Sequence, residues 1–123
     1  MLFRSVGSLA SAQEKSSGVM LTADELKKLV EPALLITGRN VQSSLWFSSM
    51  FVRGGTVHVI YTDDLGYGLP DKGTWRLDGN KFCVTYVRGE ECRHHYRLAD
   101  GSYEGRSVPG DQLQFTYRIV NKK

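Results

Sequence analysis

The segment from Gly73 to Gly105, GTWRLDGNKFCVTYVRGEECRHHYRLADGSYEG, decides the fold class of this chain. Large side chains recur in it at every second position: Trp75 and Leu77, then Phe82, Val84 and Tyr86. A period of two is typical of an antiparallel sheet with one buried and one solvated face. Glycine-containing turns, which supply the positive φ of tight hairpins, follow at Asp78-Gly79-Asn80, Arg88-Gly89-Glu90 and Asp100-Gly101. The segment therefore predicts four short antiparallel strands.

The basic residues of this segment are predicted to form its solvated face. In the third strand, Cys92, His94 and Tyr96 alternate with Arg93, His95 and Arg97. The expected solvated set is Arg76, Lys81, Arg88, Arg93 and Arg97. Such a face usually serves solvation alone. The alternative is a patch for an anionic partner, such as a surface polysaccharide, a lipid headgroup or an acidic protein.

More strands are predicted on both sides of the segment. They are expected at 33–36, 45–52, 56–61 and 112–120, whereas Asp63 to Lys72 contains glycines and Pro70 and is expected to be a loop or a ragged strand edge. About seven or eight strands with short connections predict an all-β fold. We expect a small antiparallel barrel or a strongly curled sheet, because closure removes exposed strand edges.

One short helix is predicted near residues 23–31. Thr22 as N-cap and Glu25 three residues later form a capping box, and Pro32 disfavours further helix. The apolar stripe is narrow and predicts that the helix covers one end of the sheet as a lid. This stripe consists of Leu26, Leu29 and Val30.

The chain of 123 residues is long enough for one domain, expected over 21–123, preceded by a disordered leader over 1–20. Ala10-Ser11-Ala12 matches the small-residue pattern that ends a signal peptide, although the apolar part before it is short. We interpret the leader as the remnant of a signal peptide, which predicts a periplasmic or secreted protein. The alternative is a flexible cytosolic leader.

Charge and hydropathy exclude two classes of partner. The net charge of +3 is spread along the chain, which argues against nucleic-acid binding. No apolar stretch reaches the roughly 20 residues of a membrane span.

Cys83 and Cys92 flank the Arg88-Gly89-Glu90 turn and are predicted to form a disulfide in an oxidising compartment. A three-residue turn would place the two sulfurs on opposite faces. A four-residue turn, Val87 to Glu90, would place them diagonally on one face, so the disulfide requires this register or a bulge. The alternative is two separate thiols.

The order of these motifs resembles that in a family of small exported domains from proteobacteria, notably rhizobia, described as lipocalin-like or calycin-like. The shared pattern is a helix beginning L-T-x-x-E-L, then G-T-W-R-L, F-C-V-T-Y, E-C-R-H-H-Y-R and D-G-x-Y. It covers most of residues 21–120, with markers at Gly73, Trp75, Cys83, Cys92, Tyr96 and Tyr103. The resemblance implies a lipocalin-like barrel and export from a bacterial cell, and it transfers no catalytic residue.

An apolar pocket at the open end of the barrel is the candidate site. Its expected lining is aromatic: Trp46, Tyr61, Trp75, Tyr86 and Tyr96. The alternative is that these rings, Trp75 above all, fill the core. No cofactor and no metal are expected, because adjacent His94 and His95 point to opposite faces of a strand, and His58 with Asp63 or Asp64 is more typical of a solvated surface.

The sequence thus predicts a non-enzymatic exported module that binds a small apolar ligand, a cell-envelope component or a partner surface. One alternative is a small hydrolase or isomerase with a histidine and an aspartate in the barrel mouth, which requires His58, His94 or His95 to share a cleft with an acid. Another is a secreted inhibitor or interaction protein that acts through a loop at 63–72, with its apolar side chains exposed. Those side chains are Leu65, Tyr67 and Leu69.

Overall fold

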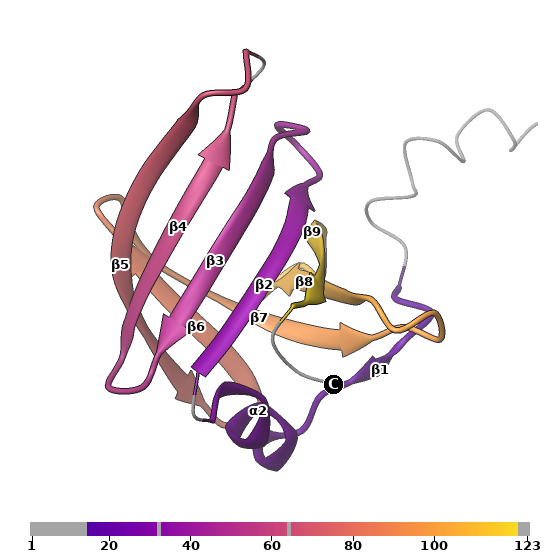
Figure 1. Ribbon diagram of the computed structural model, residues 1–123. Coiled ribbons are helices and arrows are strands. Elements are labelled where there is room, and N and C mark those ends of the chain that lie inside the picture. The colour runs from indigo at the N-terminus through magenta and orange to yellow at the C-terminus, as the bar shows by residue number, and fades with distance from the viewer. Residues whose placement is uncertain (1–14, 32, 64, 121–123) are drawn as a thin grey trace, which may run out of the picture.

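The computed structural model describes residues 15–31, 33–63 and 65–120, most of which form a closed barrel of eight antiparallel strands (Figure 1). The elements are β1 (Val19–Met20), α2 (Ala23–Val30), β2 (Ala33–Asn40), β3 (Trp46–Val52), β4 (Thr56–Thr62), β5 (Gly68–Asp78), β6 (Lys81–Tyr86), β7 (Gly89–Arg97), β8 (Tyr103–Ser107) and β9 (Leu113–Ile119). The predicted all-β barrel with one short helix is confirmed.

Each strand from β2 to β9 pairs with its neighbour in sequence, and β9 pairs back with β2 to close the barrel. Gly38 of β2 lies opposite Tyr117 of β9. A Cβ at this glycine would lie 2.2 Å from the carbonyl oxygen of Thr116, so the closing seam requires glycine there. Closure satisfies the backbone groups of β2 and β9 that an open sheet would leave exposed.

The short strand β1 lies outside the barrel and pairs with β7, Val19 opposite Arg97. The last two residues of the predicted leader, Val19 and Met20, thus pair with the sheet. Residues 1–14 of that leader lie outside the described residues.

Helix α2 lies across one end of the barrel, beside β2 and β5 (Figure 1). Its capping box is present: Glu25 N–H donates to Thr22 Oγ1, and Thr22 N–H donates to Glu25 Oε1. Leu26 and Val30 are buried in the core, which confirms the predicted lid. The described helices include none long and apolar enough to cross a membrane. The core cluster comprises Leu21, Leu26, Val30, Leu34, Ile36, Phe47, Phe51, Val57, Val59, Phe82, Val84 and Tyr117.

Strand β5 begins at Gly68, so over residues 68–72 the alternative of a strand edge holds and that of a loop does not. Pro70 lies opposite Ile60 of β4, but pairing with β6 begins only at Thr74. The first part of β5 is thus bonded on one side only, where a proline without an N–H is tolerated. The remaining turn is held by Asp63, whose Oδ1 accepts the N–H groups of Leu65 and Tyr67 at 3.0 and 2.8 Å.

The hairpin of β6 and β7 has a two-residue turn, Val87-Arg88, with Tyr86 opposite Gly89. Both predicted registers are wrong, since Gly89 is the first residue of β7 and not part of the turn. Cys83 lies directly opposite Cys92, with Cα atoms 4.0 Å apart, and the predicted disulfide is confirmed.

In this register the polar residues Glu91, Arg93 and His95 of β7 lie on the inward face. Arg93 lies opposite inward-facing Phe82, and His95 is buried. The predicted solvated position of Arg93 is therefore wrong, because the interior of the barrel is partly polar. Tyr96, on the other face of β7, contacts a polar cluster on the outside of the barrel.

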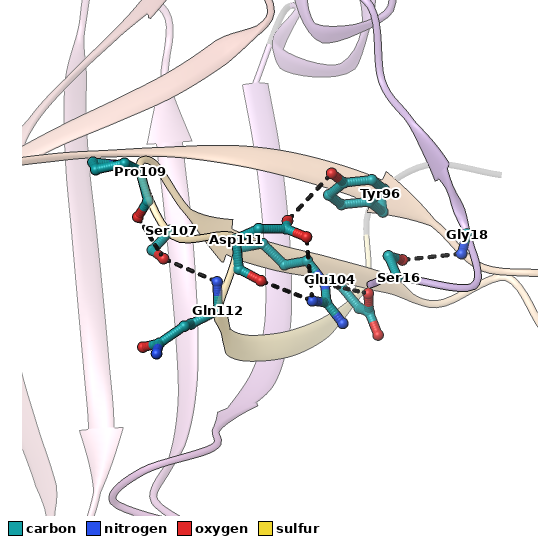
Figure 2. Close-up of polar contacts among 9 residues, drawn as sticks. Ser16, Gly18, Tyr96, Glu104, Ser107, Pro109, Asp111 and Gln112 are labelled. Atoms are coloured by element: carbon teal, nitrogen blue, oxygen red, sulfur yellow. Dashed lines mark hydrogen bonds and ion pairs between the residues drawn. The ribbon is translucent and has the colours of Figure 1, made fainter. Parts of the chain in front are cut away.

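This outer cluster is built around Arg106 of β8, which is 2% exposed. Its Nε donates to Glu104 Oε1 at 3.1 Å and its Nη1 to the carbonyl of Asp111 at 2.9 Å. The hydroxyl of Tyr96 donates to Asp111 Oδ1 at 3.4 Å (Figure 2). These contacts attach the β8–β9 connection to β7.

Candidate ligand-binding cavity

The barrel interior holds a cavity of about 400 Å³, within the usual size range of ligand pockets. Its depth can be followed along β7. Strand β7 begins with Gly89 at the hairpin turn and ends with Arg97, which pairs with Glu25 of helix α2. Glu91, Arg93 and His95 therefore lie progressively deeper, from the turn toward the helix. The apolar part of the lining consists of Leu34, Ile36, Phe47, Phe51, Val59, Phe82, Val84 and Phe115. The polar part consists of Asn40, Gln42, Ser49, Tyr61, Tyr86, Arg88, Glu91, Arg93, His95, Gln114 and Tyr117.

A second, outer hollow of about 620 Å³ shares Tyr61, Tyr86, Glu91 and Arg93 with the inner cavity. Its other walls come from the first half of β5 and from the turn between β6 and β7, through Leu69, Asp71 and Val87, and Arg88 of the same turn lines both spaces. The inner cavity therefore opens toward solvent at the end of the barrel opposite the helix. The unpaired side of β5 forms part of this mouth.

Arg93 places a positive charge in the cavity. Its Nε donates to Gln114 Oε1 and its Nη2 to Glu91 Oε1, and its guanidinium lies over the Phe115 ring, 4.9 Å from the centroid. Burial lowers the pKa of Arg93, and the neighbouring Glu91 carboxylate partly opposes that shift. The side chain of Arg93 is 15% exposed and that of Glu91 is 68% exposed, so the anion is far better solvated than the cation.

His95 and Tyr117 form a neutral hydrogen-bonded pair deeper in the cavity. His95 Nδ1 lies 2.6 Å from Tyr117 Oη. Burial, with smaller effects of the Arg93 and His94 charges, lowers the pKa of His95 to about 3, and burial raises the pKa of Tyr117. The second ring nitrogen of His95 has no hydrogen-bond partner among the described residues.

Tyr61 and Tyr86 add two hydroxyl groups to the upper wall, which is the part of the cavity wall next to the mouth. Burial raises the pKa of both, while the Arg93 charge acts in the opposite direction on each. Both hydroxyls therefore stay protonated at neutral pH and remain able to donate. Neither has a hydrogen-bond partner within the described part of the chain.

Of the five predicted pocket residues, Tyr61 and Tyr86 line the cavity and three do not. Trp46 is 57% exposed on the outer face of β3, because its neighbour Phe47 points inward. Trp75 packs on Phe82 and donates from Nε1 to the Val52 carbonyl at 2.9 Å, which agrees with the alternative of a core residue. Tyr96 belongs to the outer cluster around Arg106.

The residues that sequence reasoning missed are the polar ones on the inward face of β7, together with Gln114. The signal that would have found them is the hairpin turn. A two-residue turn at Val87-Arg88 places Glu91 and Arg93 opposite Val84 and Phe82, which had been recognised as inward-facing.

The three histidines do not share one site. His58 is exposed on the outer face of β4, and His94 lies on the outer face of β7. His95 alone lines the cavity, which it shares with the carboxylate of Glu91. Among the described residues, the group spaced for a shared metal ion is Cys83, Glu90 and Cys92, and its two sulfurs are already bonded to each other.

The turn after β4 exposes the apolar side chains named in the interaction-protein alternative. Leu65, Tyr67 and Leu69 are exposed by 81%, 67% and 47%. They lie beside the mouth of the cavity, since Leu69 also lines the outer hollow.

No family model matches this chain, and no curated protein matches it significantly. The resemblance to exported lipocalin-like domains stays a prediction. Function is therefore inferred from the cavity itself.

Proposed function

We propose that this protein is a non-enzymatic binding module that holds one small, mainly apolar ligand inside its barrel. The observation that carries the proposal is the hollow interior. An eight-stranded barrel has room either for packed side chains or for one small ligand. Here Ser49 and Val59 are too small to fill the space between the surrounding rings, and a cavity of about 400 Å³ remains.

The cavity wall favours an apolar occupant. The cavity volume of about 400 Å³ corresponds to roughly a dozen water molecules at about 30 Å³ each. Waters beside Phe47, Phe51 and Phe82 find few hydrogen-bond partners there. Their displacement by hydrocarbon is therefore favourable.

Export from the cytosol forms part of the proposal. The Cys83–Cys92 disulfide supports it, because such bonds persist mainly in oxidising compartments. The Ala10-Ser11-Ala12 pattern of a signal-peptide end supports it independently. We infer a periplasmic or secreted binding protein of a bacterium.

The alternative of a hydrolase or isomerase has less support. Although His95 shares the cavity with Glu91, its hydrogen-bond partner is Tyr117, and Glu91 is paired with Arg93. A histidine with a pKa of about 3 is a weak base at neutral pH, whereas an efficient general base has a pKa near the working pH.

A second candidate function is contact with a partner protein through the exposed turn at Leu65, Tyr67 and Leu69. The observation in its favour is that the backbone N–H groups of Leu65 and Tyr67 both donate to Asp63 Oδ1, which holds these two residues in place. A partner bound there would lie next to the cavity mouth. Replacement of Leu65 and Tyr67 by serine tests this role, because it should abolish partner binding and leave ligand binding unchanged.

Calorimetric titration with 1-decanol, a neutral amphiphile, tests the binding function. We expect saturable one-to-one binding with a negative heat-capacity change, which marks burial of apolar surface. A rise in melting temperature with decanol concentration should accompany it. If neither decanol nor decanoate binds or raises the melting temperature, the proposed function is wrong.

A further inference from the structure

We propose that the ligand is an amphiphile with a single carboxylate, which Arg93 binds near the cavity mouth while the apolar part of the ligand fills the deeper cavity. The inference rests on the proposed function, since it names the chemical class of ligand for the same cavity. Four observations lead to it, and each concerns the polar groups of the upper wall.

The first observation is that several N–H donors of Arg93 have no acceptor among the described residues. A guanidinium carries five N–H groups. Among the described residues, Gln114 accepts one from Nε and Glu91 accepts one from Nη2. Nη1 has no partner there, and Arg93 lines the cavity, so a two-oxygen acceptor inside the cavity can bind to the free donors.

The second observation is that other donors surround this cation. The hydroxyls of Tyr61 and Tyr86 line the same upper wall, and the charge of Arg93 affects the pKa of each. Both hydroxyls are unpaired within the described residues. A carboxylate at Arg93 therefore has up to two neutral donors beside a charged one, which is a combination that selects an anion over an alcohol.

The third observation is the charge balance of the lining. The inner cavity is lined by two arginines, Arg88 and Arg93, and by one carboxylate, Glu91, while His95 is neutral. The lining thus has an excess of one positive charge. A monoanion neutralises it, whereas a cation would add to the repulsion.

The fourth observation is the asymmetry of the Arg93–Glu91 pair. Arg93 is mostly buried, but the Glu91 side chain is 68% exposed and lies one step nearer the mouth. Glu91 can turn into solvent at little cost, because its carboxylate is already mostly hydrated. Glu91 is the anionic partner of Arg93, and a ligand carboxylate takes its place.

The position of the carboxylate also sets the orientation of the apolar part of the ligand. Phe115 covers one face of the Arg93 guanidinium, and the solvent mouth lies on the other side of Glu91. Deeper positions, toward helix α2, are lined by Phe51 and Phe82, whose ring centroids lie 5.0 Å apart. The carboxylate therefore stays at the mouth and the hydrocarbon points toward helix α2.

Calorimetric titration with three ten-carbon probes tests the proposal: decanoate, 1-decanol and decyltrimethylammonium at pH 7. In the unmodified protein we expect decanoate to bind at least about tenfold more tightly than decanol, because a charge-assisted hydrogen bond contributes more than a neutral one. Decyltrimethylammonium should bind most weakly. Arg93→Gln should reduce decanoate affinity to that of decanol while decanol affinity changes by less than about twofold.

Two further variants complete the design. Arg118→Gln is the matched control, since Arg118 is an exposed arginine paired with Asp100 outside the cavity, and it should leave all three affinities unchanged. Glu91→Gln removes the competing anion and should tighten decanoate binding severalfold without affecting decanol. This second variant keeps the test decisive even if Arg93→Gln does not fold.

The possible results separate the two proposals. Equal affinities for decanol and decanoate, or unchanged decanoate binding in Arg93→Gln, would overturn the carboxylate site and leave the binding function standing. A preference for decyltrimethylammonium would overturn it as well. If none of the three probes binds, the proposed function is wrong, and this inference is wrong with it.

Discussion

His95 of β7 and Tyr117 of β9 are joined by a hydrogen bond of 2.6 Å that spans the intervening strand β8. Gly105 of β8 lies between the two strands, opposite both His95 and Phe115. A Cβ at this glycine would lie 2.5 Å from the Phe115 ring, so glycine leaves the space in which these rings meet. The hydrogen bond therefore links β7 directly to β9 across β8, inside the barrel.

Removal of the Tyr117 hydroxyl should destabilise the barrel. In Tyr117→Phe the buried Nδ1 of His95 loses its partner, and we expect the free energy of unfolding in urea to fall by about 1–3 kcal/mol. The matched control is Tyr103→Phe. Tyr103 stacks on Tyr117 with ring centroids 5.2 Å apart, but its hydroxyl has no hydrogen bond within the described residues. Equal losses in the two variants would contradict the role of the hydrogen bond.

The stability of the protein should decrease in mild acid. The pKa of His95 is about 3 in the folded chain and 6.5 for an unperturbed histidine, as in the unfolded chain, so the unfolded state binds more protons between these values. The contribution of neutral His95 to the free energy of unfolding is complete above pH 6.5. It is lost as the pH falls toward 3, at up to about 1.4 kcal/mol per pH unit. Urea unfolding between pH 7 and pH 5 measures the slope.

Two histidine variants assign this slope. His95→Gln should make the free energy of unfolding nearly independent of pH between 7 and 5, whereas His58→Gln, on the exposed face of β4, should keep the dependence. The carboxylates with lowered pKa, such as Glu25 and Glu90, act in a lower window, below about pH 4.5. A slope that survives in His95→Gln would show that another group titrates.

The disulfide should stabilise the hairpin that supplies the polar cavity wall. Cys83 and Cys92 are nine positions apart, and the loop-entropy relation gives about 3 kcal/mol for a closed loop of this length. Dithiothreitol should therefore lower the midpoint of urea unfolding. Cys83→Ala/Cys92→Ala should show the lower midpoint with or without dithiothreitol, and any remaining response to the reductant would point to an effect unrelated to this bond.

A larger side chain at Ser49 should block the cavity. Ser49 is 5% exposed on the inward face of β3 and lines the cavity between Phe47 and Phe51. In Ser49→Leu we expect decanol binding to be lost in calorimetry while the melting temperature stays equal or rises, because the added methyl groups fill empty space. Ser48→Leu, at the neighbouring outward position, is the control and should bind decanol normally.

Much of the fold is predictable from local signals. The Thr22–Glu25 capping box and the period-two alternation in β4, β6 and β9 predict the helix and most strands, because each depends on neighbours close in sequence. Pro70 left the prediction for residues 63–72 open between a loop and a strand edge. A proline is compatible with a strand that is paired on one side only, and that arrangement is a property of the whole barrel.

The candidate site is less predictable, because it depends on a register. One residue more or fewer in the turn after Tyr86 exchanges the inward and outward sides of β7. Arg93 and His95 look like surface residues by polarity, and their burial follows once Cys83 and Cys92 share one face of the hairpin, as they do when Cys83 lies opposite Cys92. Polar side chains inside a hollow barrel are the case in which hydropathy assigns the wrong face.

The one-sided pairing of Gly68 to Gly73 also bears on how the protein avoids self-association. An unpaired strand edge is a template for adding a strand from another molecule, which is a route to aggregation. Pro70 interrupts this edge, because it has no N–H to offer an incoming chain. The same stretch can therefore leave the entrance of the cavity open without making the molecule prone to polymerise.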